Sequence, residues 1–346
     1  MDAQLKQYNK DTFRIAPLDG WRTISVALVI FSHLISNLVI SALDEHGRTI
    51  LIPLLLGCAS LGVNIFFVIS GYVIASGLIR EDARYGGISI YRFYIRRAFR
   101  IFPPLLIYIL LVIILARMGL IPIEAIGVVA TLTFTCNTNL FNCGGWFGGH
   151  TWSLSYEEQF YLVIPFLFYI LWKSSKYVFF MLPAIISLMT LLTYPFSDAA
   201  AGFLSHFISI ATGVSWACRE QDILYLCRII PKWAAIFAPL LFIAVMRVGN
   251  SSYWPLSHLI TPIIITFILV YSVFISFPIA RLLSTVWLTY IGRISYSIYL
   301  WQQLATFAFP GAGLCFYIFS VTLCLFCAWA SYKWIESPLI SFSQRM

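Results

Sequence analysis

Residues 59–79 read Ala-Ser-Leu-Gly-Val-Asn-Ile-Phe-Phe-Val-Ile-Ser-Gly-Tyr-Val-Ile-Ala-Ser-Gly-Leu-Ile, a run without a charged side chain. As a helix this segment would be about 32 Å long, enough to cross the hydrocarbon core of a bilayer. The whole chain has the same character: of 346 residues, 60% are hydrophobic and 10% are charged. Soluble domains carry about 25% charged residues. The composition therefore excludes a soluble enzyme, a coiled coil and a disordered chain.

Apolar stretches of similar length predict an all-α fold, a polytopic membrane helix bundle that forms one domain over residues 1–346. Segment 121–136 carries Glu124 and several threonines, so we predict an outer-face or re-entrant segment there. The predicted spans number about ten and are 22–43, 59–79, 101–119, 157–172, 177–195, 202–218, 233–248, 258–278, 286–309 and 313–334.

The net charge of +8 indicates orientation. Cytoplasmic loops of membrane proteins collect Lys and Arg, and with the N-terminus inside, eighteen of the 22 basic residues fall on the cytoplasmic side and three outside. This asymmetry predicts that both termini are cytoplasmic and that the loop 137–151 lies outside. The partners it indicates are membrane lipids, and no nucleic acid is expected.

Cysteine usage gives no metal-site pattern. Cys324 and Cys327 form a CxxC inside an apolar stretch with no His or Asp nearby, which indicates core packing, and no metal is expected. Cys136 and Cys143 lie in the predicted outer loop, where an oxidising compartment would let them pair. Two unpaired thiols are equally compatible with the sequence.

His33 lies in the middle of the first predicted span, eleven residues after Arg22. Eleven residues of helix return to within about 20° of the same face, about 16 Å further along the axis. A titratable group inside a span is costly and is a functional hypothesis by default. We therefore interpret His33 as a general base and Arg22 as its support. The alternative is a structural histidine and a cytoplasmic anchor.

A basic cluster precedes the third predicted span, in an inner loop. Arg96, Arg97 and Arg100 lie three or four residues apart, so a helical turn would present a fork of guanidinium groups. Such forks suit phosphates. Anchoring on anionic lipid explains the same residues equally well.

Two acids begin the fourth predicted span, at its outer end. Ser153 or Ser155 could cap this helix, with Glu157 and Glu158 in its first turn matching the helix dipole. The aromatic residues around them fit an interfacial belt.

Read together, these segments resemble the acyltransferase 3 family of integral membrane acyltransferases, along nearly the whole chain from Leu18 to Pro338. Each motif is weak alone, but six occur in the family's order. They are Arg22 and His33 with ten residues between them, 62–72 (GVNIFFVISGY), 97–103 (RAFRIFP), 152–161 (WSLSYEEQFY), 294–301 (ISYSIYLW) and 334–338 (WIESP).

The resemblance implies transfer of an acyl group, usually acetyl, from cytoplasmic acyl-CoA to a hydroxyl of an envelope glycan or a lipid-linked sugar, in the bacterial cytoplasmic (inner) membrane. By analogy His33 would be the catalytic base, supported by Arg22, and Arg97 with Arg100 would engage the CoA phosphates. Arg96 is expected beside them, and Glu157 is expected to act in catalysis. Acetyl-CoA is the expected donor.

The chain departs from the family pattern in two places. After Tyr299-Leu300-Trp301 many members carry His, whereas this chain has Gln302 and Gln303, so no acid–base role is expected there. The chain also ends at Met346 without the hydrolase-like outer domain of some members, so acceptor handling is expected in the membrane domain or a partner. The alternative function is a proton-coupled transporter or flippase of an envelope precursor, which needs no acyl-CoA.

Overall fold

The structure is a computed structural model that describes residues 14–39, 45–138, 143, 145–231, 254–307 and 313–345. Within these ranges the regular structure is helical and contains no strand, which confirms the predicted all-α class. The first half of the chain forms α1 (Ala16–Val39), α2 (Glu45–Tyr85), α3 (Ile90–Arg117), α4 (Ala125–Leu132), α5 (Trp146–Gly149), α6 (Trp152–Leu171), α7 (Lys176–Thr193), α8 (Asp198–Cys218) and α9 (Glu220–Ile229). The second half forms α11 (Trp254–Val270), the π-helical turn η3 (Tyr271–Ile275), α12 (Phe277–Leu283), α13 (Val286–Arg293), α14 (Ser295–Ala305), α15 (Leu314–Ser331), the π-helical turn η4 (Tyr332–Glu336) and α16 (Ser337–Ser343).

Seven helical stretches in the described part of the chain are long and apolar enough to cross a membrane, so the protein is a polytopic membrane bundle. Each overlaps one of the predicted spans. They are Ala16–Ser36, Gly47–Tyr85, Ile90–Arg117, Lys176–Thr193, Asp198–Cys218, Ser257–Ile275 and Leu314–Ser343.

The remaining three predicted spans are not among these seven stretches. Segment 157–172 belongs to the helix α6, whose hydropathy is lowered by its two acids, Glu157 and Glu158. The prediction of one span at 286–309 was wrong: the chain leaves helical geometry at Ile294 and forms the short helices α13 and α14. Segment 233–248 lies outside the described residues. Segment 121–136 contains only α4, which at eight residues is too short to cross.

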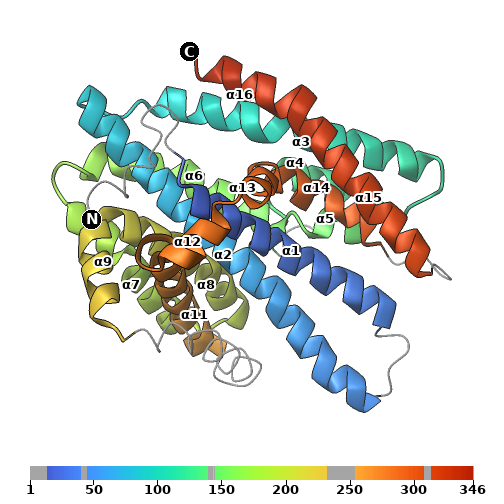
Figure 1. Ribbon diagram of the computed structural model, residues 1–346, viewed down its shortest axis with the longest axis horizontal. Helices are drawn as coiled ribbons and strands as arrows, with labels where there is room; N and C mark the ends of the chain where they lie inside the picture. Colours follow the sequence, from blue (N-terminus) through green and yellow to red (C-terminus); the bar gives the residue numbers. More distant parts are fainter. Residues whose placement is uncertain are drawn as a thin grey trace.

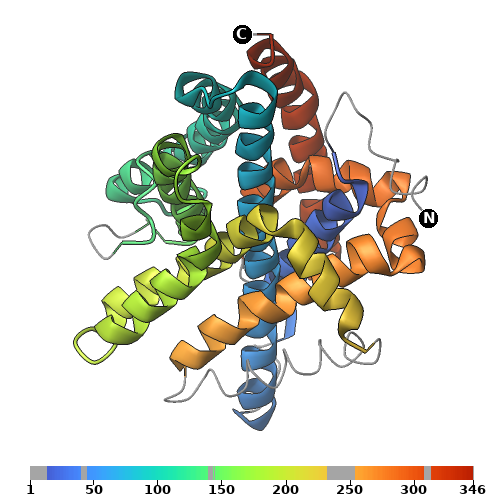
Figure 2. The ribbon, with the colours of Figure 1, turned by 90° about the vertical axis from the view of Figure 1, so that its left-hand side faces the viewer.

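The long helix α2 is the centre of the bundle (Figures 1 and 2). Helices α1 and α8 pack along it, and α7 and α11 pack on α8. On the other side α3 runs beside η4 and α16, while α14 packs against α15 and α1 contacts α12 and α13. Segments from both ends of the sequence therefore enclose the region between α1, α2, α3, α6 and α14.

Two glycines let α2 and α8 approach closely. A Cβ on Gly71 would overlap the carbonyl oxygen of Ile210, and a Cβ on Gly213 would overlap that of Val68. Small residues at helix contacts are the usual means of close packing in membranes.

We expect Gly213→Ala to lower the free energy of unfolding by about 1–3 kcal/mol, because the added methyl group meets backbone that cannot rotate away. Thermal unfolding in detergent micelles measures this. The matched control is Gly202→Ala on the same helix, where an added Cβ would meet no atom within 4 Å apart from the local backbone of its own helix. An equal loss in both variants would contradict the packing argument.

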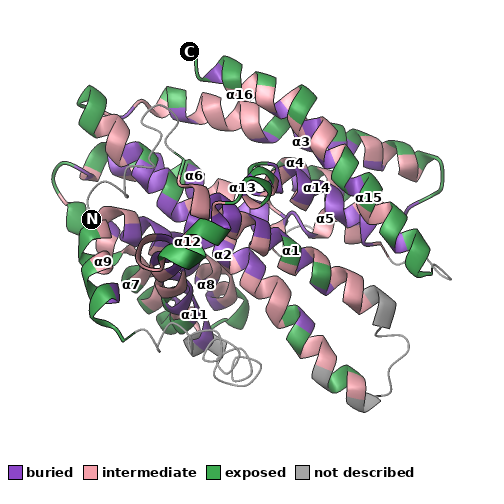
Figure 3. Ribbon diagram, viewed as in Figure 1, coloured by how far each residue is buried: buried purple, intermediate pink, exposed green. Residues whose placement is uncertain are grey.

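The outer surface of the bundle is apolar. On α3 the side chains of Leu106, Leu110 and Ile114 are exposed, and on α7 those of Leu188 and Leu192 are exposed. Figure 3 shows such exposed positions along the outward faces of the peripheral helices. Exposed apolar side chains at helical spacing over several turns are what contact with lipid tails requires.

The predicted orientation can be tested across α7, because Ser174, just before this helix, and Asp198, the first residue of α8, are both exposed. We expect Ser174→Cys to react with a membrane-impermeant maleimide only from the cytoplasmic side and Asp198→Cys only from the outer side. Labelling of intact cells and of inverted vesicles, compared with the unsubstituted protein, makes the measurement. Reaction of both from one side would refute the predicted topology.

The open question about the outer loop is resolved by a disulfide between Cys136 and Cys143. It closes the turn that follows α4 and lies beside α5, because a Cβ on Gly148 would overlap the Cys143 carbonyl oxygen. Thr151 Oγ1 also donates a hydrogen bond to the Gly148 carbonyl oxygen at 2.7 Å. Cys143 thus packs against α5, and Thr151 joins α5 to the start of α6.

Candidate functional site

A cavity, here called the central cavity, lies between α1, α2, α3, α6 and α14. Its wall combines apolar side chains with arginines, a carboxylate and several hydroxyls. The polar lining residues are Arg22, Ser70, Arg97, Arg100, Ser153, Glu157, Tyr161, Ser295, Tyr296 and Tyr299.

Two of the three cavity arginines, Arg97 and Arg100, come from the body of α3. The helical turn predicted for these arginines is confirmed, but the helix starts earlier than the predicted span at 101: α3 begins at Ile90, and Ser89 caps it by accepting a hydrogen bond from the Arg92 N–H. Arg97 and Arg100 are therefore in the second and third turns of a continuous helix. The Arg97 guanidinium lies over the Tyr161 ring, 3.7 Å from its centroid.

The two acids meet these arginines inside the bundle. Ser70 Oγ donates a hydrogen bond of 2.8 Å to Glu157 Oε1, and Arg97 lies 3.8 Å from a Glu158 oxygen. The predicted caps at Ser153 and Ser155 were wrong. Helix α6 already begins at Trp152, and the Ser155 hydroxyl donates to the carbonyl oxygen of Thr151 at 3.0 Å. The acids therefore lie beyond the first turn and face α3.

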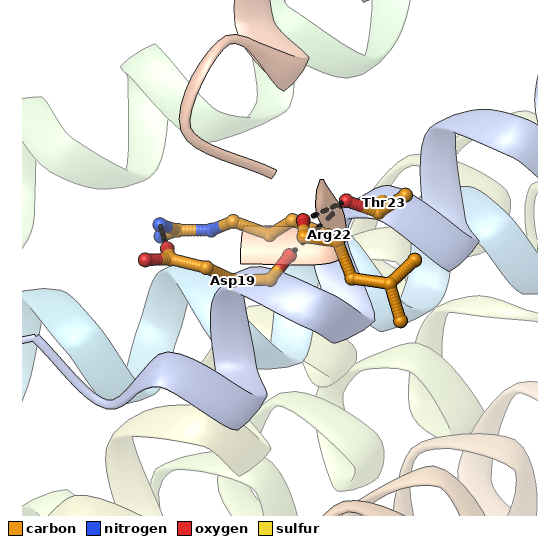
Figure 4. Close-up of polar contacts among 4 residues, drawn as sticks. Asp19, Arg22 and Thr23 are labelled. Atoms are coloured by element: carbon orange, nitrogen blue, oxygen red, sulfur yellow. Dashed lines mark hydrogen bonds and ion pairs between the residues drawn. The ribbon is translucent and has the colours of Figure 1, made fainter. Parts of the chain in front are cut away.

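Arg22 is held on α1 by Asp19. The two side chains form an ion pair of 3.2 Å, and Thr23 donates a hydrogen bond to the Leu288 carbonyl oxygen at 2.5 Å (Figure 4). A Cβ on Gly292 would overlap the Asp19 carbonyl oxygen, so α13 approaches α1 at the level of this pair. Arg22 is thereby fixed at the border of two cavities.

The second cavity, here called the arginine pocket, adjoins the first. Both are lined by Arg22, Val73 and Arg100. The arginine pocket is lined by five arginines from α1, α2, α3, α13 and the chain before α1, namely Arg14, Arg22, Arg80, Arg100 and Arg293, with Asp19 as its one acid. Such a pocket suits a ligand with several negative charges.

Arg96 lies apart from both cavities. Its guanidinium donates to Glu81 Oε2 at 2.9 Å, which joins the start of α3 to the end of α2. Of the residues predicted from sequence, the structure brings together Arg22, Arg97, Arg100 and Glu157, and it places Arg96 outside their group.

Glu336 lies next to the site, and the sequence predicted no role for it. It is 2% exposed, ends the π-helical turn η4 and accepts a hydrogen bond from Ser297. It is close enough to Arg100 for an electrostatic interaction. Single π-helical turns often occur at functional sites. The only signal in the sequence was the motif 334–338, because nothing in the local pattern shows that Glu336 faces Arg100.

His33 lies on α1 about three turns beyond Arg22 and is not part of the central cavity wall. Its Nδ1 is 3.1 Å from Gln302 Oε1 on α14, and its ring packs against Trp146 with centroids 5.3 Å apart. The sequence did not predict that Gln302 contacts His33, because Gln302 stands where the family pattern has a histidine.

Tyr299 connects the cavity with the neighbourhood of His33. Tyr299 lines the central cavity, hydrogen-bonds Ser153 at 2.7 Å and donates to the carbonyl oxygen of His150 at 2.7 Å. His150 lies in the turn between α5 and α6, where burial lowers the pKa of its ring to about 3. It is therefore neutral at physiological pH and leaves His33 as the titratable imidazole of this region.

Comparison with known proteins gives a consistent result. The sequence profile of the family described as "Acyltransferase domain" matches residues 15–336. The O-acetyltransferase OatA of Staphylococcus aureus (strain NCTC 8325 / PS 47) is 28% identical over 373 residues, which cover 93% of this chain and 56% of OatA. A protein of Staphylococcus aureus (strain COL) that is provisionally named an O-acetyltransferase is 26% identical over 94% of this chain and 57% of its own length. The chain thus spans little more than half the length of these relatives, and no solved structure matches it.

Proposed function

The chain belongs to the family of the acyltransferase domain, and we propose from this that it is a membrane O-acyltransferase. It moves an acyl group, in the first instance acetyl, from cytoplasmic acyl-CoA to a hydroxyl of a cell-envelope glycan or glycolipid. Its place is the bacterial cytoplasmic (inner) membrane, and both termini face the cytoplasm.

One observation supports this proposal above the others: the arginine pocket and the central cavity share Arg22 and Arg100. A ligand that fits both has a polyanionic end and a long, mostly neutral arm. CoA has this form, with phosphates at one end and an extended pantetheine chain ending in the thioester at the other. Arg22, where the two cavities join, and His33 lie about 16 Å apart along α1, a distance that an extended pantetheine arm can cover.

The roles of the charged residues follow from this placement. Arg100 and Arg97 bind the donor phosphates through charge-assisted hydrogen bonds, and Arg22 holds the donor where the two cavities join. Arg96 positions the start of α3 through Glu81. Glu157, fixed by Ser70 and facing the cavity, supports catalysis by accepting a hydrogen bond from an amide N–H of the pantetheine arm.

The reaction needs a base because a thioester is already activated while a hydroxyl is a poor nucleophile. His33 takes the proton of the acceptor hydroxyl as its oxygen bonds to the acyl carbon. The carbon–sulfur bond then breaks, and the CoA thiolate receives the proton from His33. No net charge is left in the membrane. Donor and acceptor approach from opposite ends, the donor from the arginine pocket and the acceptor past Trp146.

Incubation of the purified protein in nanodiscs with radiolabelled acetyl-CoA and envelope glycan tests the function. Label is expected in the glycan, and base treatment should release it as acetate because the new bond is an ester. Movement of a lipid-linked precursor across the bilayer without label transfer would overturn the proposal in favour of a transporter.

A further inference from the structure

A chain of side-chain amides leads away from His33. His33 Nδ1 is 3.1 Å from Gln302 Oε1, and Gln302 Nε2 donates to Gln303 Oε1 at 2.8 Å. Gln303 Nε2 in turn donates to the backbone carbonyl oxygen of Trp146 at 2.7 Å. The chain therefore begins at a titratable ring and ends at a backbone group.

The backbone end fixes the direction of every bond in the chain. A carbonyl oxygen only accepts, so the Gln303 atom that faces Trp146 is its NH₂ group. Gln303 Oε1 then faces Gln302 and accepts from the Gln302 NH₂ group. This leaves Gln302 Oε1, which also only accepts, toward His33. The Nδ1 of neutral His33 must therefore carry the hydrogen, and the lone pair lies on Nε2.

The opposite orientation of the two glutamine amides is unfavourable. If Gln302 were turned over, two amide oxygens would face one another at 2.8 Å. If both amides were turned over, the clash would move to Gln303 and the Trp146 carbonyl. Gln302 is 1% exposed and Gln303 is 3% exposed, so water cannot replace a lost partner. The Trp146 indole also donates to the Gln303 carbonyl oxygen at 2.8 Å, which ties α5 to α14 from the other side.

We propose that Gln302 is a positioning residue that holds neutral His33 with its proton on Nδ1 and directs the Nε2 lone pair to the acceptor hydroxyl. This rests on the proposed acyl transfer for the identity of the acceptor and for the role of His33 as its base, whereas the tautomer of His33 rests on the hydrogen bonds alone. When Nε2 takes a proton, Nδ1–H keeps its bond to Gln302, so the amide chain does not rearrange. The partner is uncharged, which avoids placing a second ion inside the bundle.

The tautomer can be read directly by nitrogen NMR of protein labelled with ring-¹⁵N histidine, reconstituted in nanodiscs. Subtraction of the His33→Ala spectrum isolates the His33 signals. In the wild type at pH 8 we expect a protonated Nδ1 and an unprotonated Nε2. In Gln302→Leu we expect this preference to be lost. Gln302→Glu keeps an acceptor oxygen, so it should retain the wild-type tautomer.

Kinetics give the second readout. Gln302→Leu should lower kcat by about 10- to 100-fold, because an unmade hydrogen bond leaves the ring unoriented, while KM for the acyl donor stays unchanged. Gln302→Glu should recover only part of the lost turnover, because its acceptor oxygen still faces His33 while its second oxygen faces Gln303 Oε1 in place of the donating NH₂ group. A wild-type His33 protonated on Nε2, or a Gln302→Leu protein that keeps both tautomer and kcat, would overturn the inference. Correct tautomer without any acyl transfer would instead refute the proposed function alone.

Discussion

His33→Ala is expected to lower turnover at saturating acyl donor by about 10²–10⁴-fold, the usual contribution of a positioned general base. The loss should be in kcat, because His33 is outside the central cavity wall and about 16 Å along α1 from Arg22. KM for the donor should stay close to the wild-type value. Transfer of radiolabel from acetyl-CoA to the glycan measures both constants.

The control for this variant is His258→Ala, a half-buried histidine of α11 that lines neither cavity. It should leave turnover nearly unchanged. Wild-type activity should also fall on acidification as His33 takes a proton, whereas His150, with its pKa near 3, stays neutral. A His33→Ala protein that retains near wild-type turnover would remove the base assignment and direct attention to Glu157 and Glu158.

Arg100→Ala is expected to raise KM for acyl-CoA by about 10- to 150-fold. Arg100 lines both cavities, and loss of a charge-assisted bond to phosphate costs about 1.5–3 kcal/mol. Binding of CoA, followed by calorimetry, should weaken by the same factor, while Arg96→Ala should have a much smaller effect because Arg96 pairs with Glu81 outside the cavities.

Arg100 interacts electrostatically with the buried Glu336, so its loss affects stability as well as binding. Arg100→Ala combined with Glu336→Gln removes both members of this interaction, and this double variant should still bind CoA weakly. Arg92→Ala on the exposed side of α3 is the matched control. If Arg100→Ala binds CoA like the wild type, the donor does not use this arginine.

The fold was predictable from hydropathy to a large extent because length and apolarity are what a bilayer demands of a helix. Segment 286–309 was predicted wrongly because it is mostly apolar, with Arg293 as its one charged residue. Its break at Ile294 depends on packing: α13 meets α1 where Gly292 touches the Asp19 backbone. The sequence of 286–309 alone cannot predict this contact, because its partner Asp19 lies in another part of the chain.

The sequence predicted individual residues of the site, but not which of them lie together in space. Sequence motifs singled out Arg22, Arg97, Arg100 and Glu157 in separate segments, and only the fold shows that they share a cavity. The arginine pocket could not be anticipated, since its members come from five parts of the chain. Gln302 carried a signal, a polar residue within an apolar stretch, but its departure from the family pattern obscured a role as partner of His33.

Helix α14 carries both a residue of the central cavity wall and the hydrogen-bond partner of His33. Tyr299 lines the central cavity, and Gln302, three residues later, contacts His33. Residues at this spacing are neighbours on one helix, so any rotation or sliding of α14 displaces both together. A shift of α14 on donor binding would therefore also displace the partner of His33, because a wall residue of the central cavity and that partner belong to one short helix.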